Sequence, residues 1–373
     1  MKKIIFILLI VISACNNNTE QEKGVKIITA CEDSNDKLLS IDYDISFVQL
    51  ETSDECLLGY IRNFEFTKEY IYVLDRNTFY IFSCKGKFIK KVKRGKGPGE
   101  LTRALNFSVD EKFKEIYIIE MGNIMHIYDL NANYKRTIKF NGSYTDVIRP
   151  DNDNFILYTS LFARFGVKYL ISVYNIKKER IVKKFITNEK LPMKNLTILD
   201  YNNFYINSTD EIYFTACNSR TIYKYENDSM KPAYSIDFNK FEPPVSFIES
   251  FNKVRDFRKA AFKENYVGFL FNGYIFDDFL LVGFKTKNYN CGICFNDDNK
   301  LHLTTLSSLF DLPATTSFDI IGNAKKNTLY FMYNNDILLN SDITESEKNL
   351  TIKGKSIKIH DNNNPVIIEL TLK

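Results

Sequence analysis

Short runs of apolar residues, rich in tyrosine, phenylalanine and isoleucine, recur along the chain from about residue 45 to the C-terminus. Residues 70–89 contain YIYVLD, FYIF and KGKFI in that order, and residues 115–135 contain EIYIIE, MHIYD and NYK in the same order. Polar turns separate the runs. Short runs of β-branched and aromatic residues between turn residues are typical of β-strands. Each stretch therefore predicts a small group of strands joined by turns.

The strand groups repeat at a spacing that indicates a ring of small sheets. Tyr72 recurs at Tyr117, a looser copy of the group follows at 154–182, a clearer one at 210–225, and further copies are indicated at 279–295 and 327–332. Repeats of about 40 to 50 residues built from short strands are typical of propeller blades, which bury their faces only against neighbouring blades. We therefore predict an all-β fold, a six-bladed β-propeller. The strands expected at 45–50 and 365–372 are left over, and we predict that they share one blade, which closes the ring.

One segment departs from the strand pattern and predicts a helix. Residues 246–249 (SFIE) have the spacing of a capping box, and Phe247, Phe251, Val254 and Ala261 then lie on one helical face. We predict a helical insertion between blades four and five. Its apolar stripe favours packing on the side of the propeller. Covering the central channel is the alternative role.

The N-terminus has the layout of a secretory signal. Lys2 and Lys3 precede an apolar run over 4–12, and Ser13 and Ala14 lead to Cys15. The run is too short for a transmembrane helix. Its end resembles the lipobox of bacterial lipoproteins, in which the cysteine is lipidated. We predict a lipoprotein signal peptide over 1–14, a polar flexible tether over 15–44 and the propeller over 45–373.

The charge balance and the cysteines bear on two kinds of function, nucleic-acid binding and redox or metal chemistry. The chain has 50 basic and 46 acidic side chains and a net charge of +4, which gives no support for nucleic-acid binding. Cys291 and Cys294 have the spacing of a redox or metal motif, but they lie in a predicted strand without a second pair of ligands. We interpret them as buried structural residues.

The glycine-rich stretch 94–101 (RGKGPGEL) is better explained as a turn than as a phosphate-binding loop. The spacing of its glycines does not match a P-loop, Pro98 lacks an N–H donor, and no helix is predicted after it. Pro98 followed by Gly99 suits a type II turn.

The chain resembles the six-bladed β-propeller lipoproteins of Gram-negative gut-type bacteria, which are related in architecture to TolB-like and NHL-repeat propellers. The resemblance is carried by 48–51 (VQLE), 59–61 (GYI), 71–75 (IYVLD), 82–88 and 95–100 (GKGPGE), and it is most specific between residues 47 and 130. It implies that GKGPGE connects consecutive blades and that the protein lies in the cell envelope, at the outer membrane. It implies no catalytic motif.

Candidate site residues are few. His126, His302 and His360 are far apart in the sequence, and we predict no catalytic residues. His126 is interpreted as a hydrogen-bonded structural residue. Asp75 and Glu120 follow equivalent strands, so both are expected at one end of the ring, where they would bind a ligand. The alternative is that each carboxylate caps the turn that follows it.

Two classes of function stay open. The first is a lipid-anchored binding or scaffold module for a glycan, a peptide or an envelope protein. The second is a metal-dependent enzyme of the lyase or lactonase type. No cofactor is predicted for the first, whereas calcium, which takes oxygen ligands, would suit a ring of Asp, Asn and Glu in the second.

Overall fold

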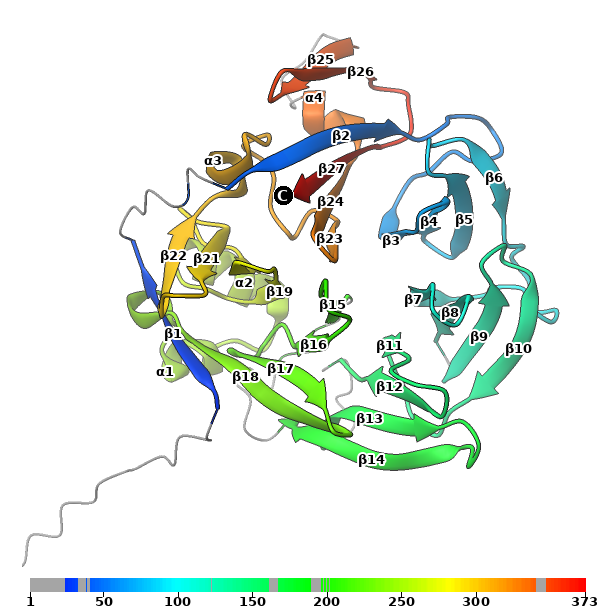
Figure 1. Cartoon of the computed structure of the whole chain (residues 1–373), viewed down its shortest axis with the longest axis horizontal. Coiled ribbons are helices and arrows are strands. Elements are labelled where there is room, and N and C mark those ends of the chain that lie inside the picture. Colours follow the sequence, from blue (N-terminus) through cyan, green and yellow to red (C-terminus); the bar gives the residue numbers. More distant parts are fainter. Residues whose placement is uncertain are drawn as a thin grey trace, which may run out of the picture.

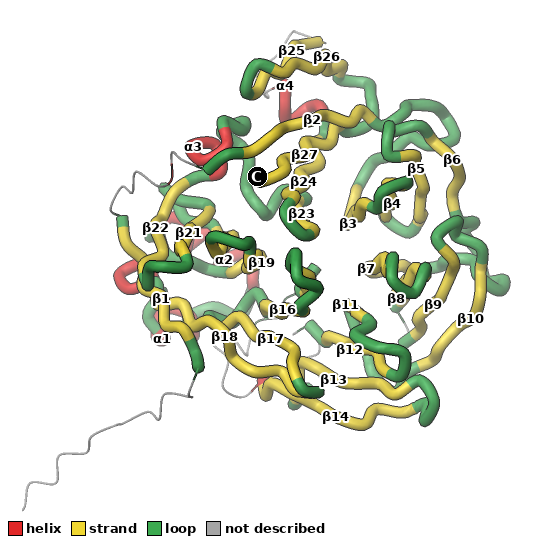
Figure 2. The backbone as a smooth tube through the Cα atoms, viewed as in Figure 1, coloured by secondary structure: helices red, strands yellow, loops and turns green. Residues whose placement is uncertain are grey.

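The structure is a computed structural model that describes residues 24–32, 38, 41–121, 123–160, 167–188, 196, 198, 200, 202–339 and 347–373. Strands dominate it, and they form small sheets arranged around a common centre (Figures 1 and 2). In the described part of the chain, no helix is both long and apolar enough to cross a membrane. The predicted all-β, propeller-type architecture is therefore present.

Three consecutive stretches each form one four-stranded antiparallel sheet, with the first strand nearest the centre (Figure 1). The first sheet consists of β3 (Ile61–Phe66), β4 (Tyr70–Asp75), β5 (Thr78–Ser83) and β6 (Phe88–Lys91). The second consists of β7 (Ala104–Asp110), β8 (Glu115–Glu120), β9 (Ile124–Asp129) and β10 (Tyr134–Lys139). The third consists of β11 (Asp146–Ile148), β12 (Asn154–Tyr158), β13 (Tyr169–Asn175) and β14 (Arg180–Thr187).

The next two strand groups are joined into one nine-stranded sheet. One half consists of β15 (Phe204–Ile206), β16 (Ile212–Thr215), β17 (Thr221–Glu226) and β18 (Ser229–Asp237). The other half consists of β19 (Leu270–Ile275), β20 (Phe279–Phe284), β21 (Cys291–Phe295) and β22 (Lys300–Thr304). Strand β1 (Lys26–Cys31) lies between the two outermost strands, β18 and β22, and runs parallel to both.

Strand β1 corrects the prediction of a flexible tether over 15–44, because 26–31 lie inside that range. Ile28 and Ala30 are buried while Ile27 and Thr29 are exposed, which is the alternation of a half-buried strand. The physical reason is that, without β1, the outer edges of β18 and β22 would lack a hydrogen-bonding partner. Strand β1 pairs with both. The strand was not predicted because the sequence around it is polar and because its parallel partners lie far along the chain.

The strands predicted at 45–50 and 365–372 pair in the last sheet, as predicted. Its strands, from the centre outward, are β23 (Gly322–Lys325), β24 (Thr328–Tyr333), β27 (Val366–Leu372) and β2 (Tyr43–Gln49). Strand β2 is antiparallel to β27 in a continuous register from Tyr43 opposite Leu372 to Gln49 opposite Val366. Strand β2 therefore holds the last strand, β27, in place and closes the ring.

The burial of the strands explains the apolar runs in the sequence. Every residue of β8 and β20 is buried, whereas no residue of the outermost strand β10 is. The middle strands are covered on both faces by the neighbouring sheets, so they do not show the alternation of a half-exposed strand. Tyrosine and phenylalanine fill the space between the sheets. The largest fully buried side chains include Tyr72, Tyr117, Phe107 and Phe155.

The remaining elements are short and lie between strands. A 3-10 turn (Asn239–Phe241), α1 (Val245–Glu249) and α2 (Val254–Lys263) lie between β18 and β19. Helix α3 (Leu306–Phe310) follows β22, and α4 (Asn335–Leu339) with the hairpin β25 (Glu347–Ile352) and β26 (Lys355–His360) lies between β24 and β27.

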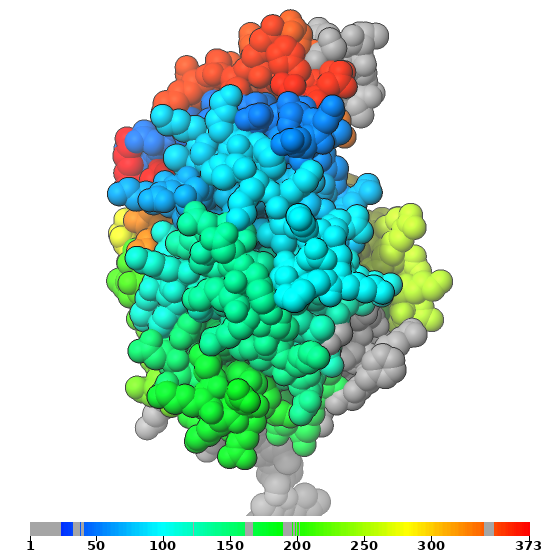
Figure 3. Space-filling model, turned by 90° about the vertical axis from the view of Figure 1, so that its right-hand side faces the viewer, coloured from blue at the N-terminus to red at the C-terminus, as the bar shows by residue number. Residues whose placement is uncertain are grey.

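The helix predicted from residue 246 onward is present as two helices. Phe257 and Ala261 are buried, and Phe247, Phe251 and Val254 pack beside them against strand residues of the same apolar cluster. The predicted capping box is wrong, because Ser246 lies inside α1 and the helix begins after Pro244 without a side-chain cap. The helical segment projects from one end of the ring, where it appears yellow-green in Figure 3.

The turn predicted at 94–101 joins β6 to β7 and therefore connects two sheets. The Glu100 N–H donates to the Gly97 carbonyl at 3.0 Å across Pro98 and Gly99, and Gly99 has φ of 71°. This is the geometry of a type II turn. A Cβ on Gly99 would lie 2.5 Å from the Tyr134 side chain, so the close approach also requires glycine. The interpretation as a turn is confirmed.

Candidate functional site

One end of the ring carries the long connections, and we call it the loop face. In each antiparallel sheet the innermost strand begins at the end where the second strand stops: Ile61 pairs with Asp75, Ala104 with Glu120, and Leu270 with Phe284. The links between sheets and the insertions after second strands therefore lie at this end, including α1, α2 and α3. The opposite end has short hairpins, such as 67–69 and 111–114. Long loops on a rigid scaffold are where binding residues concentrate.

Asp75 lies at this face and holds the loop in front of β3. Its side chain is buried, and its two carboxylate oxygens accept the N–H of Gly59 at 2.9 Å and of Tyr60 at 2.6 Å. Two charge-assisted hydrogen bonds to adjacent amides fix the direction of the loop.

Glu120 holds the equivalent loop in front of β7. The buried carboxylate accepts the N–H of Thr102 at 2.5 Å and of Arg103 at 3.0 Å, and it lies 3.2 Å from Nε2 of His126. Burial acts to raise the pKa of Glu120, but the hydrogen bonds from His126 and from the two amides outweigh it and the pKa is lowered. His126 also contacts the Thr137 hydroxyl at 2.8 Å, so its interpretation as a hydrogen-bonded residue is confirmed.

The two predicted site residues therefore occupy equivalent positions, but each is turned toward the loop of its own sheet. The groups exposed to solvent at these two positions belong to the loops that the carboxylates hold. Leu57 and Tyr60 are 59% and 63% exposed beside Asp75, and Met121, which follows Glu120, is 45% exposed. Arg76 and Arg103 are also exposed at the same two places. Direct ligand contact by Asp75 and Glu120 stays a prediction, whereas their support of these loops is visible in the contacts.

A belt of amide and carboxyl groups links the innermost strands and was not predicted. Asn63 Nδ2 donates to Asn106 Oδ1 at 2.8 Å, and Asn106 Nδ2 donates to Asp146 Oδ1 at 3.2 Å. The Asn203 N–H donates to Asp146 Oδ2 at 2.8 Å, and Asn323 Nδ2 donates to a carbonyl of β3 at 3.2 Å. The belt thus joins consecutive sheets around the centre.

Two acids near this belt are strongly perturbed. Burial raises the pKa of Asp146 to about 7, although amide N–H donors act against the shift. Burial likewise raises the pKa of Glu65 to about 8, opposed by Lys325 and by the Val109 N–H, which lies 3.1 Å from its carboxylate. Among the described residues, the buried Oδ1 atoms of Asn63 and Asn203 have no hydrogen-bond partner. The belt therefore has spare acceptor capacity.

The sequence contained a signal for this belt. The dipeptide Asn-Phe occurs at 63–64, 106–107 and 203–204, in or directly before the innermost strands β3, β7 and β15, but it also occurs at 154–155 in the second strand β12. The strand pattern alone did not distinguish innermost strands from the others, so the recurring asparagine was not recognised as a contact between sheets.

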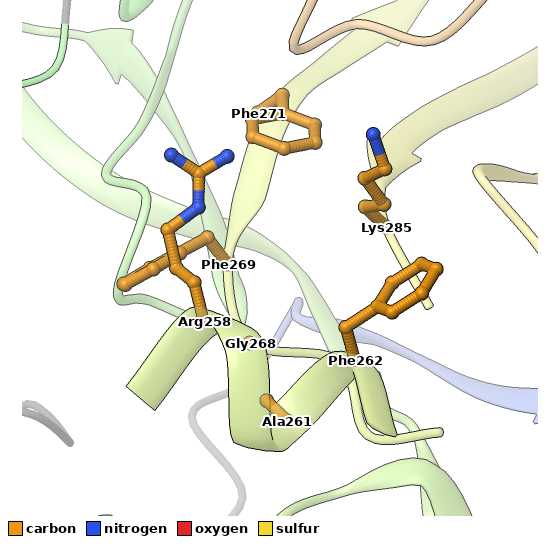
Figure 4. Close-up of a pocket in the computed structure, with 7 residues that line it drawn as sticks. All are labelled: Arg258, Ala261, Phe262, Gly268, Phe269, Phe271 and Lys285. Atoms are coloured by element: carbon orange, nitrogen blue, oxygen red, sulfur yellow. The ribbon is translucent and has the colours of Figure 1, made fainter. Parts of the chain in front are cut away.

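A small pocket lies beside α2 at the loop face. Phe262, Phe269 and Phe271 form its apolar wall, and the side chains of Arg258 and Lys285 lie beside them (Figure 4). The Asp319 carboxylate forms ion pairs with both cations, at 2.7 Å from the Lys285 ammonium and 3.9 Å from the Arg258 guanidinium. The pocket adds a basic and aromatic patch to the same face.

Cys291 and Cys294 lie in β21 and are both buried, in agreement with their interpretation as structural residues. Burial raises the pKa of each thiol. Among the described residues, no three His, Cys, Asp or Glu side chains are grouped in a way that could hold a metal ion. Cys15 and the signal peptide lie outside the described residues.

The chain was compared with known proteins. No curated protein matches it. The solved structure of an exported protein from Bacteroides fragilis is similar over 94% of this chain and 99% of that one, with a TM-score of 0.66 and 14% identity, a likeness that concerns the fold alone. Virginiamycin B lyase from Staphylococcus aureus is more distant, with a TM-score of 0.44 and 9% identity over 89% of this chain and all of that one. The chain belongs to the family described as a domain of unknown function (DUF4934), whose model matches residues 24–371.

Proposed function

We propose that the protein is a six-bladed β-propeller lipoprotein of the cell envelope that binds a glycan, a peptide or an envelope protein through its loop face. Four separate four-stranded sheets and the two halves of the nine-stranded sheet support a count of six blades. On this count, α1 and α2 form the helical insertion between blades four and five.

The envelope location is supported by the sequence at the N-terminus and by the exported protein from Bacteroides fragilis with a similar fold. Lipidation of Cys15 would anchor the chain in the outer membrane, because more than one acyl chain gives a stable anchor. The TolB-like and NHL-like resemblance of residues 47–130 agrees with this location.

The observation that carries the binding proposal is the pair of exposed loops held by buried carboxylates. Tyrosine, arginine and methionine are enriched where proteins bind partners, and Tyr60, Arg76, Arg103 and Met121 gather at two equivalent positions. Because Asp75 and Glu120 fix the backbone of both loops, little conformational entropy is lost when a partner binds. Arginine side chains favour carboxylate groups, so we propose an acidic glycan or peptide as the partner.

The alternative is a metal-dependent enzyme of the lyase or lactonase type. The belt around Asp146 favours it, because carboxyl and amide oxygens are the ligands that calcium takes and two buried Oδ1 atoms have no partner among the described residues. Added calcium should then raise the melting temperature of the wild-type protein, and Asp146→Asn should abolish that rise. An unchanged melting temperature would remove the support for this alternative.

The binding proposal is tested with a double variant, Tyr60→Ala with Arg103→Ala. Binding is measured on surfaces that carry acidic and neutral polysaccharides or acidic peptides, and melting temperatures are recorded beside it. Val182→Ala is the matched control, since Val182 is 38% exposed but lies on the outermost strand β14, away from the loop face. We expect the double variant alone to lose binding without loss of stability. Equal binding by all three proteins would contradict the proposal.

A further inference from the structure

A cysteine, a histidine and an aspartate form a hydrogen-bonded series in the nine-stranded sheet, at the outer side of the ring where β1 pairs with β22. Cys31 is the last residue of β1 and lies directly opposite His302 in the parallel pairing of β1 with β22. The two side chains therefore lie on the same face of the sheet, and Cys31 Sγ is 3.4 Å from His302 Nδ1. Cys31 is partly exposed, whereas His302 is buried.

Asp298 orients the imidazole from the other side. His302 Nε2 lies 2.8 Å from Asp298 Oδ2, in the turn between β21 and β22. The second oxygen of Asp298 accepts the N–H of Asn299 at 2.7 Å and of Lys300 at 3.0 Å. Burial acts to raise the pKa of Asp298, but the hydrogen bonds from His302 and from the two amides lower it, so this carboxylate stays ionised.

This arrangement assigns distinct roles to the two ring nitrogens. An ionised Asp298 favours the tautomer with the proton on Nε2, which leaves Nδ1 as an acceptor toward the thiol. A thiol whose proton can pass to an adjacent histidine has more thiolate at neutral pH, and the thiolate is the nucleophile. A nucleophile within hydrogen-bond reach of a base that a third group orients is the arrangement that activates cysteine in enzymes.

We propose that Cys31 is a reactive thiol that exchanges with disulfides, with His302 as its base and Asp298 as a positioning residue. His302 Nδ1 takes the thiol proton, and the Cys31 thiolate attacks one sulfur of a disulfide R–S–S–R. The bond between Cys31 and that sulfur forms as the R–S–S–R bond breaks, and the released thiolate takes the proton from His302. The products are a mixed disulfide on Cys31 and one thiol.

The co-reactant is a small disulfide or an accessible disulfide of another protein. Such compounds persist in oxidising compartments outside the cytoplasm. The availability of such disulfides in the cell rests on the proposed envelope location. The exchange reaction of Cys31 with an added disulfide does not depend on that location. The site lies where β1 pairs with β22 at the outer side of the ring, so it is separate from the two loops proposed to bind the partner.

Cys84 provides a reference thiol in the same chain. Its side chain is exposed, more so than that of Cys31, and within the described structure no hydrogen bond of its sulfur is seen. Exposure alone would make Cys84 the faster thiol. Activation by His302 reverses this order, so the two explanations of reactivity predict opposite results.

The test uses the full chain with Cys15→Ser and dithiobis(nitrobenzoate) as the disulfide probe. Cys31 is followed in a Cys84→Ser background and Cys84 in a Cys31→Ser background, at neutral pH. We expect Cys31 to react about tenfold faster than Cys84, and His302→Gln to remove this advantage. Asp298→Asn should give an intermediate rate and a smaller thiolate absorbance in the ultraviolet, which a purely structural role would not change.

Cys31 reacting no faster than Cys84, or an unchanged rate in the His302→Gln variant, would overturn the proposal. If His302→Gln fails to fold, as its melting curve would show, the rate and the thiolate absorbance of Asp298→Asn decide instead. Variants of the loop face should exchange normally, so a failure of partner binding and a failure of thiol exchange can be told apart.

Discussion

At the residue scale, the carboxyl groups at the rim of the ring and on its innermost strand β3 have different surroundings. Asp75 and Glu120 each accept two backbone N–H groups, whereas Glu65 accepts one and burial raises its pKa to about 8. Carboxyl groups therefore hold loops at the rim of the ring, whereas Glu65, on the innermost strand β3, holds a proton. These differences have separate experimental consequences.

Replacing the loop-holding carboxylates should cost stability as well as binding. Asp75→Ala leaves the Gly59 and Tyr60 amides without their charged acceptor, and Glu120→Ala does the same for Thr102 and Arg103. We expect each variant to lower the free energy of unfolding by about 2 to 4 kcal/mol, measured by urea denaturation. Asp54→Ala, an exposed acid in the same connection as Tyr60, is the control and should change little. Full stability in both variants would contradict the anchoring role.

The pH dependence of stability should reveal Glu65. Its pKa is about 8 in the folded protein, mainly because of burial, and near its ordinary value of 4.5 in the unfolded chain. Between these values the folded state holds a proton that the unfolded chain releases, so the free energy of unfolding falls as the pH rises. Glu65→Gln removes this loss and should gain about 1 to 2 kcal/mol relative to wild type between pH 5 and pH 8.

Urea denaturation at several pH values measures this gain. The exposed Glu69 lies in the next turn of the same sheet, and Glu69→Gln is the matched control. Parallel pH profiles for wild type and Glu65→Gln would show that Glu65 is ionised in the folded protein.

At the scale of elements, adjacent residues of β1 alternate between buried and exposed positions and should therefore contribute unequally to the free energy of unfolding. Ile28 is fully buried in the large apolar cluster, whereas the adjacent Ile27 is 45% exposed. Ile28→Ala should lower the free energy of unfolding by about 2 to 5 kcal/mol, because it leaves a cavity in that cluster. Ile27→Ala should change it by less than about 0.5 kcal/mol. Similar melting temperatures for the two variants would mean that β1 does not pack as a strand.

The elements that could be predicted from the sequence are those whose partners are close along the chain. The strands around Tyr72 and Tyr117 pair with their sequence neighbours, and the turn at Pro98 and Gly99 depends on two adjacent residues. Strand β1 could not be recognised this way, because its partners are far along the chain and parallel to it.

The same limit applies to the candidate sites. Equivalent positions of Asp75 and Glu120 followed from the repeat, but the direction of each side chain depends on loop amides that the repeat does not specify. Cys31 and His302 are 271 residues apart, and neither has a local motif that suggests the other. Only the pairing of β1 with β22 brings them together.

At the scale of the whole molecule, β1 changes how the ring would sit relative to a membrane. If Cys15 carries lipid, the connection to the ring is the stretch 16–25 and not the longer segment predicted as a tether. About ten residues reach about 35 Å when fully extended. The outer side of the ring at β1 would then be held within that distance of the lipid headgroups.

This geometry depends on lipidation of Cys15, which can be tested in cells by fractionation. The apolar run over 4–12 followed by Ser13, Ala14 and Cys15 predicts a cleaved and acylated cysteine, and two or more acyl chains give stable membrane binding. Wild type should partition with membranes, and Cys15→Ser should not. Cys84→Ser, which removes an exposed thiol far from the signal, should partition as wild type does. If Cys15→Ser stays with the membranes at high salt, the anchor must lie elsewhere in the chain.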